Sequence, residues 1–147
     1  MPHSLVLVRV HIVFSTKSRE PLINLELQPK LWAYFRGIAR NQKMDALAVG
    51  GMEDHVHLLV GLPSTISVAK AVQLLKGNTS KWLNEKGMNF DWQQGYAAFS
   101  VSNSLVSKVC QYIRNQRQHH KRFSYEEEIM ALLKKHGIDA DLADVLG

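Results

Sequence analysis

Strand-like and helix-like hydrophobic patterns follow one another along this chain in the order β-α-β-β-α-β-α, and few folds accommodate that order. Residues 5–16 alternate apolar and polar side chains as a half-buried strand does, with Arg9 and His11 on the polar face. Apolar residues at helical spacing then run from about Leu25 to Gln42.

The later elements follow from the same two periods and from turn and capping residues. They are expected at residues 44–52 (strand), 55–62 (strand), 67 to about 86 (helix, capped by Ser67), 97–101 (strand), 102 to about 122 (helix, capped by Ser102 or Ser104) and about 125–135 (helix). This order predicts a ferredoxin-like sandwich, an α+β fold with an antiparallel sheet, helices on one face and additional C-terminal helices. Its first and third strands are neighbours, so His55 and His57 should emerge on the same open face as Arg9 and His11.

The length of 147 residues predicts a single domain over 1–147, with a core at about 5–123 and a short helix and tail at 124–147. With 46% hydrophobic and 21% charged residues, the composition excludes a disordered or fibrous chain. The apolar run 5–14 is interrupted by charge and is too short to span a bilayer, and no signal peptide is evident. The lone Cys110 suits a reducing compartment, so we expect a cytoplasmic protein without membrane contact.

Basic residues exceed acidic ones by 18 to 13, and they concentrate in one segment. Lys108–Arg122 contains five lysines and arginines and two histidines but no acidic residue. Such a segment is a natural partner for a polyanion, nucleic acid above all. It is equally compatible with a solvated helix face that balances the acidic cluster Glu126–Glu128.

Two residue pairs could carry chemistry. His55 and His57, two apart on a strand, project side by side and could bind one divalent cation, although strand histidines without a metal show the same spacing. Tyr112 and Gln116, four apart on a helix, would share one face. Tyr112 alone could be a core aromatic, and Gln116 alone a solvated helix residue.

Five segments together resemble one known family: HIVFSTKSREPL (11–22), GGMEDHVHLLVGLP (50–63), LKGNTSKWL (75–83), WQQGYAAFSVS (92–102) and QYIRNQRQHH (111–120). In this order they look like the transposases of the insertion-sequence 200/605 type. These are the smallest HUH enzymes, named for a His-hydrophobe-His motif that acts with one catalytic tyrosine.

The resemblance implies an activity and a set of roles. His55, His57 and Gln116 are expected to bind a divalent metal, Mg²⁺ or Mn²⁺, and Tyr112 is expected to be the nucleophile. Such enzymes cleave and rejoin single-stranded DNA at hairpin-marked element ends through a 5′-phosphotyrosine, without a nucleoside triphosphate. They form homodimers in which the tyrosine-bearing helix can complete the partner's site.

The expected DNA contacts are basic or imidazole side chains on the open sheet face, the second helix and the basic segment: Arg9, His11, Lys76, Arg114, Arg117, His120, Lys121 and Arg122. Three other functions stay open. A domesticated relative would process repeated chromosomal hairpins, and a non-catalytic domain would only bind single strands or hairpins. A metal-dependent phosphodiesterase would hydrolyse its substrate without needing the tyrosine.

Overall fold

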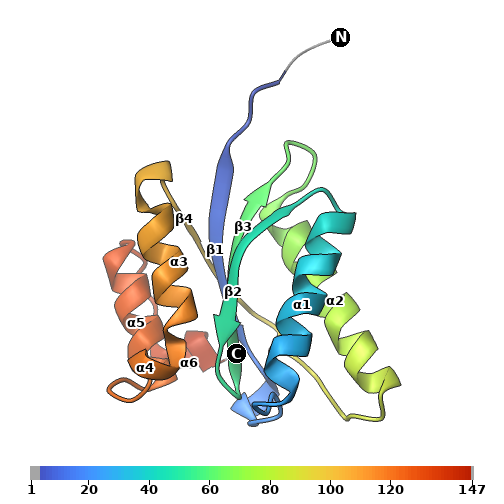
Figure 1. The fold of residues 1–147 in the computed structure, drawn as a ribbon. Helices are drawn as coiled ribbons and strands as arrows, with labels where there is room; N and C mark the ends of the chain where they lie inside the picture. The colour runs from blue at the N-terminus through green and yellow to red at the C-terminus, as the bar shows by residue number, and fades with distance from the viewer. Residues whose placement is uncertain (1–3, 147) are drawn as a thin grey trace.

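A four-stranded sheet lies at the centre of the computed structural model, which describes residues 4–146, and helices pack on both of its faces (Figure 1). The strands are β1 (Val8–Ser15), β2 (Asp45–Gly51), β3 (His55–Leu62) and β4 (Ala97–Ser100). The helices are α1 (Leu27–Asn41), α2 (Val68–Glu85), α3 (Val106–Arg114), α4 (Gln116–His119), α5 (Tyr125–Lys135) and α6 (Leu142–Leu146), with 3-10 turns η1 (Lys17–Arg19) and η2 (Asn103–Leu105). Within the described residues, none of these helices is both long enough and apolar enough to cross a membrane.

The sheet confirms the ferredoxin-like α+β class. Its strand order is β2-β3-β1-β4 with every neighbouring pair antiparallel, so β1 and β3 form the centre as predicted. On one face, Ile12 and Phe14 of β1 and Val56 and Leu58 of β3 are buried in the main hydrophobic core beneath α1 and α2. Burial of each such side chain contributes about 1.5–3 kcal/mol, and this free energy fixes which face of β1 and β3 packs against α1 and α2.

The second face of the sheet is covered by α3, α4 and α5, whereas the sequence suggested an open face (Figure 1). Helix α3 approaches the sheet closely at Gly50 of β2, where a Cβ atom would lie 2.3 Å from the carbonyl oxygen of Ile113. Glycine permits this approach because it has no Cβ atom. His11, His55 and His57 share this face as predicted, but they are buried beneath the C-terminal helices.

The helix expected from 102 to about 122 is divided. It consists of the turn η2, helix α3 and the short helix α4, with a break at Asn115, where φ is −98° and ψ is 23°. The break lies between Tyr112 and Gln116, so regular helical spacing does not set how these two side chains are placed. The last predicted helix, 125–135, matches α5.

Candidate active site

The two histidines of β3 lie on the sheet face that α3, α4 and α5 cover. Because side chains alternate along a strand, His55 and His57 project from the same face, and their ring centroids are 5.2 Å apart. Both rings are buried. Buried imidazoles need polar partners, since an unpaired polar group in the interior costs free energy.

Each ring is oriented by a contact at its Nδ1 atom. Oδ1 of Asp54 lies 2.8 Å from Nδ1 of His55, and Nε2 of His11 lies 2.8 Å from Nδ1 of His57. His11 comes from the neighbouring strand β1 and is itself buried. These contacts leave the Nε2 atoms of His55 and His57 free to face a common point between β3 and α5, and metal-binding histidines are commonly oriented in this way.

Gln116 and Tyr112 reach the same point from the other side. Gln116 is the first residue of α4, it is buried, and its Oε1 lies 3.0 Å from Nε2 of His55. Tyr112 of α3 is half-buried, with its ring edge-on to that of His57 at 5.6 Å between centroids. The structure therefore brings together the four residues for which the sequence predicts chemistry, although they come from three elements.

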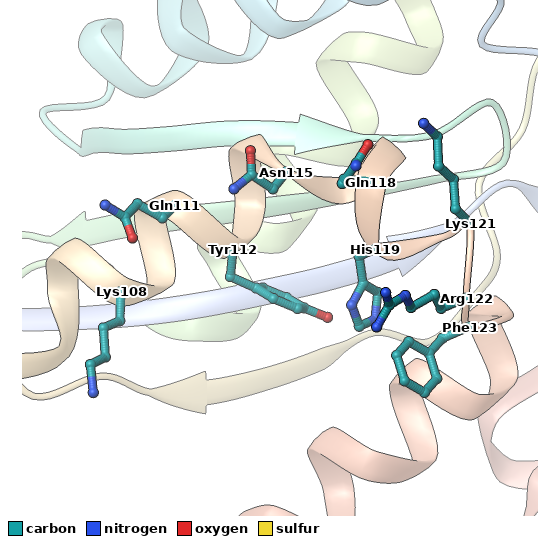
Figure 2. Close-up of a pocket in the computed structure, with 9 residues that line it drawn as sticks. All are labelled: Lys108, Gln111, Tyr112, Asn115, Gln118, His119, Lys121, Arg122 and Phe123. Atoms are coloured by element: carbon teal, nitrogen blue, oxygen red, sulfur yellow. The ribbon is translucent and has the colours of Figure 1, made fainter.

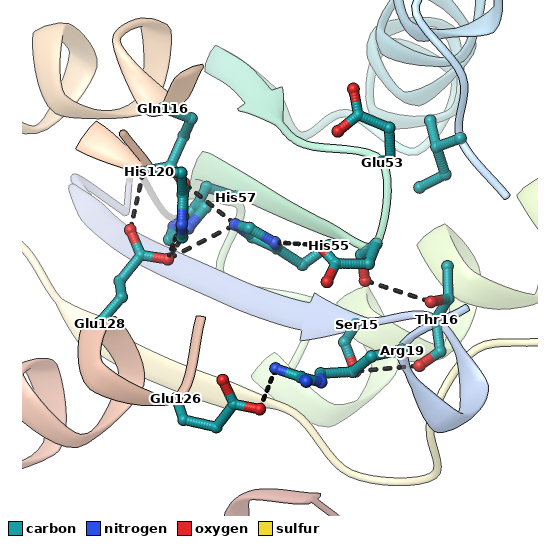
Figure 3. A network of polar contacts seen from close by, with 12 residues as sticks. Ser15, Thr16, Arg19, Glu53, His55, His57, Gln116, His120, Glu126 and Glu128 are labelled. Carbon is teal, nitrogen blue, oxygen red and sulfur yellow. Dashed lines mark hydrogen bonds and ion pairs between the residues drawn. The ribbon is translucent and has the colours of Figure 1, made fainter. Parts of the chain in front are cut away.

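A carboxylate that the sequence patterns did not single out, Glu128 of α5, joins these four side chains, and Figure 3 shows it beside His55, His57 and Gln116. Its Oε1 lies 3.1 Å from Nε2 of His57 and 3.4 Å from Nε2 of His55. Its Oε2 accepts a hydrogen bond of 2.9 Å from Nε2 of Gln116 and another from the hydroxyl of Tyr112. Glu128 therefore contacts all four of them.

Helical periodicity was the signal that could have identified Glu128. The buried residues of α5 share one helical face: Tyr125, Glu128, Ile129 and Leu133. A carboxylate on the buried stripe of an amphipathic helix needs partners inside the protein. The charge pattern suggests one acidic cluster, but the structure separates its members: Glu126 pairs with Arg19 and Glu127 caps α5 with Ser124, while Glu128 points inward.

Two consecutive histidines complete the cluster. Nε2 of His120 lies 3.0 Å from Oε1 of Gln116 and 3.1 Å from Oε1 of Glu128. Nε2 of His119 lies 3.5 Å from Oε2 of Glu128. His120, one of the predicted DNA contacts, is therefore directed into this network and competes with His55 for the same oxygen atoms.

The Glu128 carboxylate sets the protonation of its neighbours. Burial would raise the pKa of Glu128, but hydrogen bonds from the histidines, above all His120, hold it well below its usual range. Burial would lower the pKa of His55, yet hydrogen bonds to Asp54 and Glu128 raise it to about 9. Burial and the Glu128 charge raise the pKa of Tyr112 well above its usual value. The cluster thus holds a carboxylate, a protonated imidazole and a neutral tyrosine.

The donor atoms fit a divalent cation. One donor atom each of His55, His57 and Glu128 lies within 4.8 Å of the others, and Oε1 of Gln116 lies beside His55. The contacts of 3.0, 3.1 and 3.4 Å among these atoms are hydrogen bonds and an ion pair, and they bring nitrogen and oxygen donors from β3, α4 and α5 to one point. Imidazole nitrogens combined with carboxylate and amide oxygens suit Mn²⁺ or Zn²⁺ and also leave Mg²⁺ possible.

Four predicted DNA contacts lie in the exposed part of the C-terminal half. Arg114 of α3 is exposed, as are Lys121 and Arg122, which follow α4. Arg117 of α4 is also exposed, but its guanidinium group pairs with Glu53 at 2.6 Å. These residues lie near Tyr112 in the sequence, and α3 and α4 lie on one face of the sheet (Figure 1), so their predicted role is compatible with their position.

The other predicted DNA contacts form hydrogen bonds or ring contacts with other residues of the protein. Lys76 of α2 donates hydrogen bonds to the backbone carbonyl oxygens of residues 93–95. Arg9 donates a hydrogen bond to the side chain of Asn103. His11 is buried, so its position favours orienting His57 over contacting DNA. Their roles in DNA binding remain predictions.

Comparison with known sequences gives matches over most of the chain. The family described as "Transposase IS200 like" matches residues 4–116. The ISDra2 transposase TnpA of Deinococcus radiodurans is 27% identical over 115 residues, which cover 72% of this chain and 81% of that protein. The transposase for insertion sequence element IS200 of Salmonella typhimurium is 26% identical over 121 residues, covering 77% of this chain and 79% of that protein.

Solved structures share the fold. A crystal structure from Deinococcus radiodurans R1, described as that of a transposase, has a TM-score of 0.63 at 24% identity and covers 79% of this chain and 95% of that one. The REP-associated tyrosine transposase bound to a REP hairpin has a TM-score of 0.61 at 14% identity, covering 82% of this chain and 73% of that one. The family match ends at Gln116 and so includes His55, His57 and Tyr112. This chain therefore belongs to the IS200-like transposases, a family of DNA strand transferases.

Proposed function

We propose that the protein cleaves and rejoins single-stranded DNA at hairpin-marked element ends, with Tyr112 as nucleophile and a divalent metal as cofactor. The observation that carries this proposal is the hydrogen bond from the Tyr112 hydroxyl to Glu128, the carboxylate that also contacts His57. A nucleophile and a set of metal-binding donors therefore converge on one point, as attack on a phosphodiester requires. A domain that only binds nucleic acid does not need this arrangement.

His55, His57, Gln116 and Glu128 would hold the metal, which we propose to be Mg²⁺ or Mn²⁺. A divalent cation supplies positive charge that offsets the charge of the scissile phosphate, an effect worth roughly several kcal/mol. The Asp54 and His11 contacts at the Nδ1 atoms keep both imidazoles in the orientation that such binding needs.

Tyr112 carries the covalent step. Its oxygen attacks the scissile phosphorus, the bond between phosphorus and the 3′ oxygen breaks, and the 3′ oxygen takes up a proton and leaves as a hydroxyl. The 5′ phosphate stays on Tyr112 as a phosphotyrosine. Because this linkage conserves the energy of the broken bond, a 3′ hydroxyl can reverse the step without a nucleoside triphosphate.

Glu128 holds the phenol in place, since its Oε2 accepts the Tyr112 hydrogen bond, while its low pKa makes it a weak acceptor for the phenol proton itself. Burial and the Glu128 charge raise the pKa of Tyr112, so the proposed nucleophile is protonated at neutral pH. The raised pKa of Tyr112 favours a site in which DNA cleavage needs a bound cation.

The proposed substrate is a DNA hairpin with an unpaired flank. The structural neighbour that was solved with a REP hairpin supports this class of substrate. The exposed Lys121 and Arg122 line the same cavity as Tyr112 and provide positive charge beside it, and the exposed Arg114 lies two residues after Tyr112 in the chain. A homodimer remains part of the proposal. Tyr112 reaches the carboxylate of its own chain, so the arrangement described here does not itself require a second copy.

The test is covalent trapping on a denaturing gel. Labelled hairpin DNA from the flanks of the gene is incubated with Mn²⁺ or Mg²⁺ and either the wild-type protein or Tyr112→Phe. A metal-dependent adduct that is absent from Tyr112→Phe supports the proposal. Cleavage that survives in Tyr112→Phe supports a phosphodiesterase, and tight binding without an adduct supports a domain that only binds nucleic acid.

A further inference from the structure

An open cavity of about 680 Å³ lies beside Tyr112 (Figure 2). Tyr112 and Lys108 of α3 line one side, and His119, Arg122 and Phe123 line the other. The Tyr112 hydroxyl points along the cavity towards His119. Pockets for small ligands measure about 300–1,000 Å³, so the volume suits a group the size of one nucleotide.

Aromatic rings form a continuous wall of this cavity. Phe123 is 47% exposed, and its ring stacks on that of His119 with 5.0 Å between centroids and an interplanar angle of 27°. The His119 ring in turn lies edge-on to Tyr112 at 5.2 Å. An exposed ring that a second ring supports is a stacking surface, and proteins bind the bases of single strands on such surfaces.

Unpaired positive charge surrounds the aromatic wall. Lys108, Lys121 and Arg122 line the cavity, and no ion pair among residues 4–146 involves any of the three. By contrast, the neighbouring Arg117 pairs with Glu53 outside this cavity. None of the described residues that line the cavity is acidic. Free cations beside a stacking surface match the two parts of a nucleotide, its phosphate and its base.

We infer that this cavity holds one unpaired nucleotide next to the phosphate that Tyr112 attacks, with its base stacked on Phe123 and its phosphates near Lys121 and Arg122. The inference rests on the proposed function because it takes Tyr112 as the nucleophile. It assigns to Phe123 a role that the function alone does not require: a base held there fixes the strand on the hydroxyl side of Tyr112. Phe123 is thus a DNA-binding and positioning residue.

Binding without cleavage tests the inference. Fluorescence anisotropy with EDTA measures the affinity for a labelled hairpin from the gene's flank that carries its single-stranded foot. The variants are Phe123→Ala, Phe123→Trp and, as matched control, Tyr96→Ala, which removes an aromatic ring of similar exposure (42%) that lines a different cavity. Phe123→Ala should weaken binding about 5- to 100-fold, whereas Phe123→Trp and Tyr96→Ala should bind as the wild type does.

An abasic scan of the foot locates the stacked base. One abasic position should weaken wild-type binding by a factor similar to that of Phe123→Ala and should have no further effect in that variant. Wild-type affinity in Phe123→Ala, or an abasic effect that persists there in full, would overturn the inference. Because neither measurement uses metal or cleavage, Phe123-dependent binding without any covalent adduct would contradict the proposed function and would leave only the base-binding role of Phe123 standing.

Discussion

The hydroxyl of Tyr112 donates a hydrogen bond to Oε2 of Glu128, and this contact joins α3 to α5 across the histidine face of the sheet. The other oxygen of the same carboxylate lies 3.1 Å from Nε2 of His57. The proposed nucleophile and the proposed metal ligands therefore share one side chain, and α5 is part of the site as well as part of the fold.

Replacing Glu128 tests this link. Glu128→Gln keeps the shape of the side chain but removes its charge, so Mn²⁺ affinity should fall by at least about tenfold. Isothermal titration calorimetry measures the affinity. Glu127→Gln is the matched control, because Glu127 is exposed and a glutamine can still cap the helix with Ser124. Equal Mn²⁺ affinity in both variants would rule out Glu128 as a ligand.

His11 should act through His57. His11→Phe removes the contact at Nδ1 of His57 but leaves the space filled, so metal affinity should fall about 10–100-fold while the fold persists. His136→Phe, an exposed change outside the cluster, should have no such effect. Titration with Mn²⁺ measures the metal affinity, and thermal unfolding shows whether the fold persists. A His11→Phe variant with unchanged metal affinity would show that His11 only fills space.

Much of the site could be predicted from the sequence, because side chains along a strand alternate between its two faces. This alternation places His55 and His57 on one face, and the β1–β3 pairing adds His11 to that face. The position of Gln116, just after the break at Asn115, could not be predicted in this way. It is fixed by contacts with His55 and Glu128, which belong to remote segments of the chain. A local helical pattern does not encode such contacts.

The sequence patterns also did not predict that helices cover the second face of the sheet. The C-terminal helices could be recognised from their periodicity, as the match of 125–135 to α5 shows, but periodicity does not say where a helix packs. The close approach at Gly50 and the inward direction of Glu128 become visible only once α3 and α5 lie on the sheet.

Metal affinity should rise with pH. The pKa of His55 is about 9 in the metal-free protein, so at pH 7 its ring carries a proton that a cation must displace. Affinity should therefore increase about tenfold per pH unit from pH 7 towards 9 and then level off. Mn²⁺ titrations at pH 7, 7.5 and 8 measure the slope, and Asp54→Asn, which removes one stabiliser of the protonated ring, should flatten it. A flat profile in the wild type would contradict this ionisation.

Gly50 should control how close α3 lies to the sheet. In Gly50→Ala the added Cβ meets the Ile113 carbonyl oxygen at 2.3 Å, so the backbone must shift. We expect a loss of about 1–3 kcal/mol in the free energy of unfolding, together with less adduct formation because Tyr112 moves with α3. Gly77→Ala on α2, where the added Cβ meets nothing within 4 Å, should not destabilise the protein. Urea unfolding compares the two variants.

The central claim is that Tyr112 becomes linked to a 5′ phosphate of DNA. Hairpin DNA labelled at its 3′ end in one sample and at its 5′ end in another is incubated with the protein and Mn²⁺, and the adduct is then digested and mapped by mass spectrometry. The account predicts that only the 3′ label travels with the protein, that the peptide containing Tyr112 carries a 5′-linked nucleotide, and that the 5′-labelled product ends in a free 3′ hydroxyl. A 5′ label on the protein, or a nucleotide on any other residue, would contradict it.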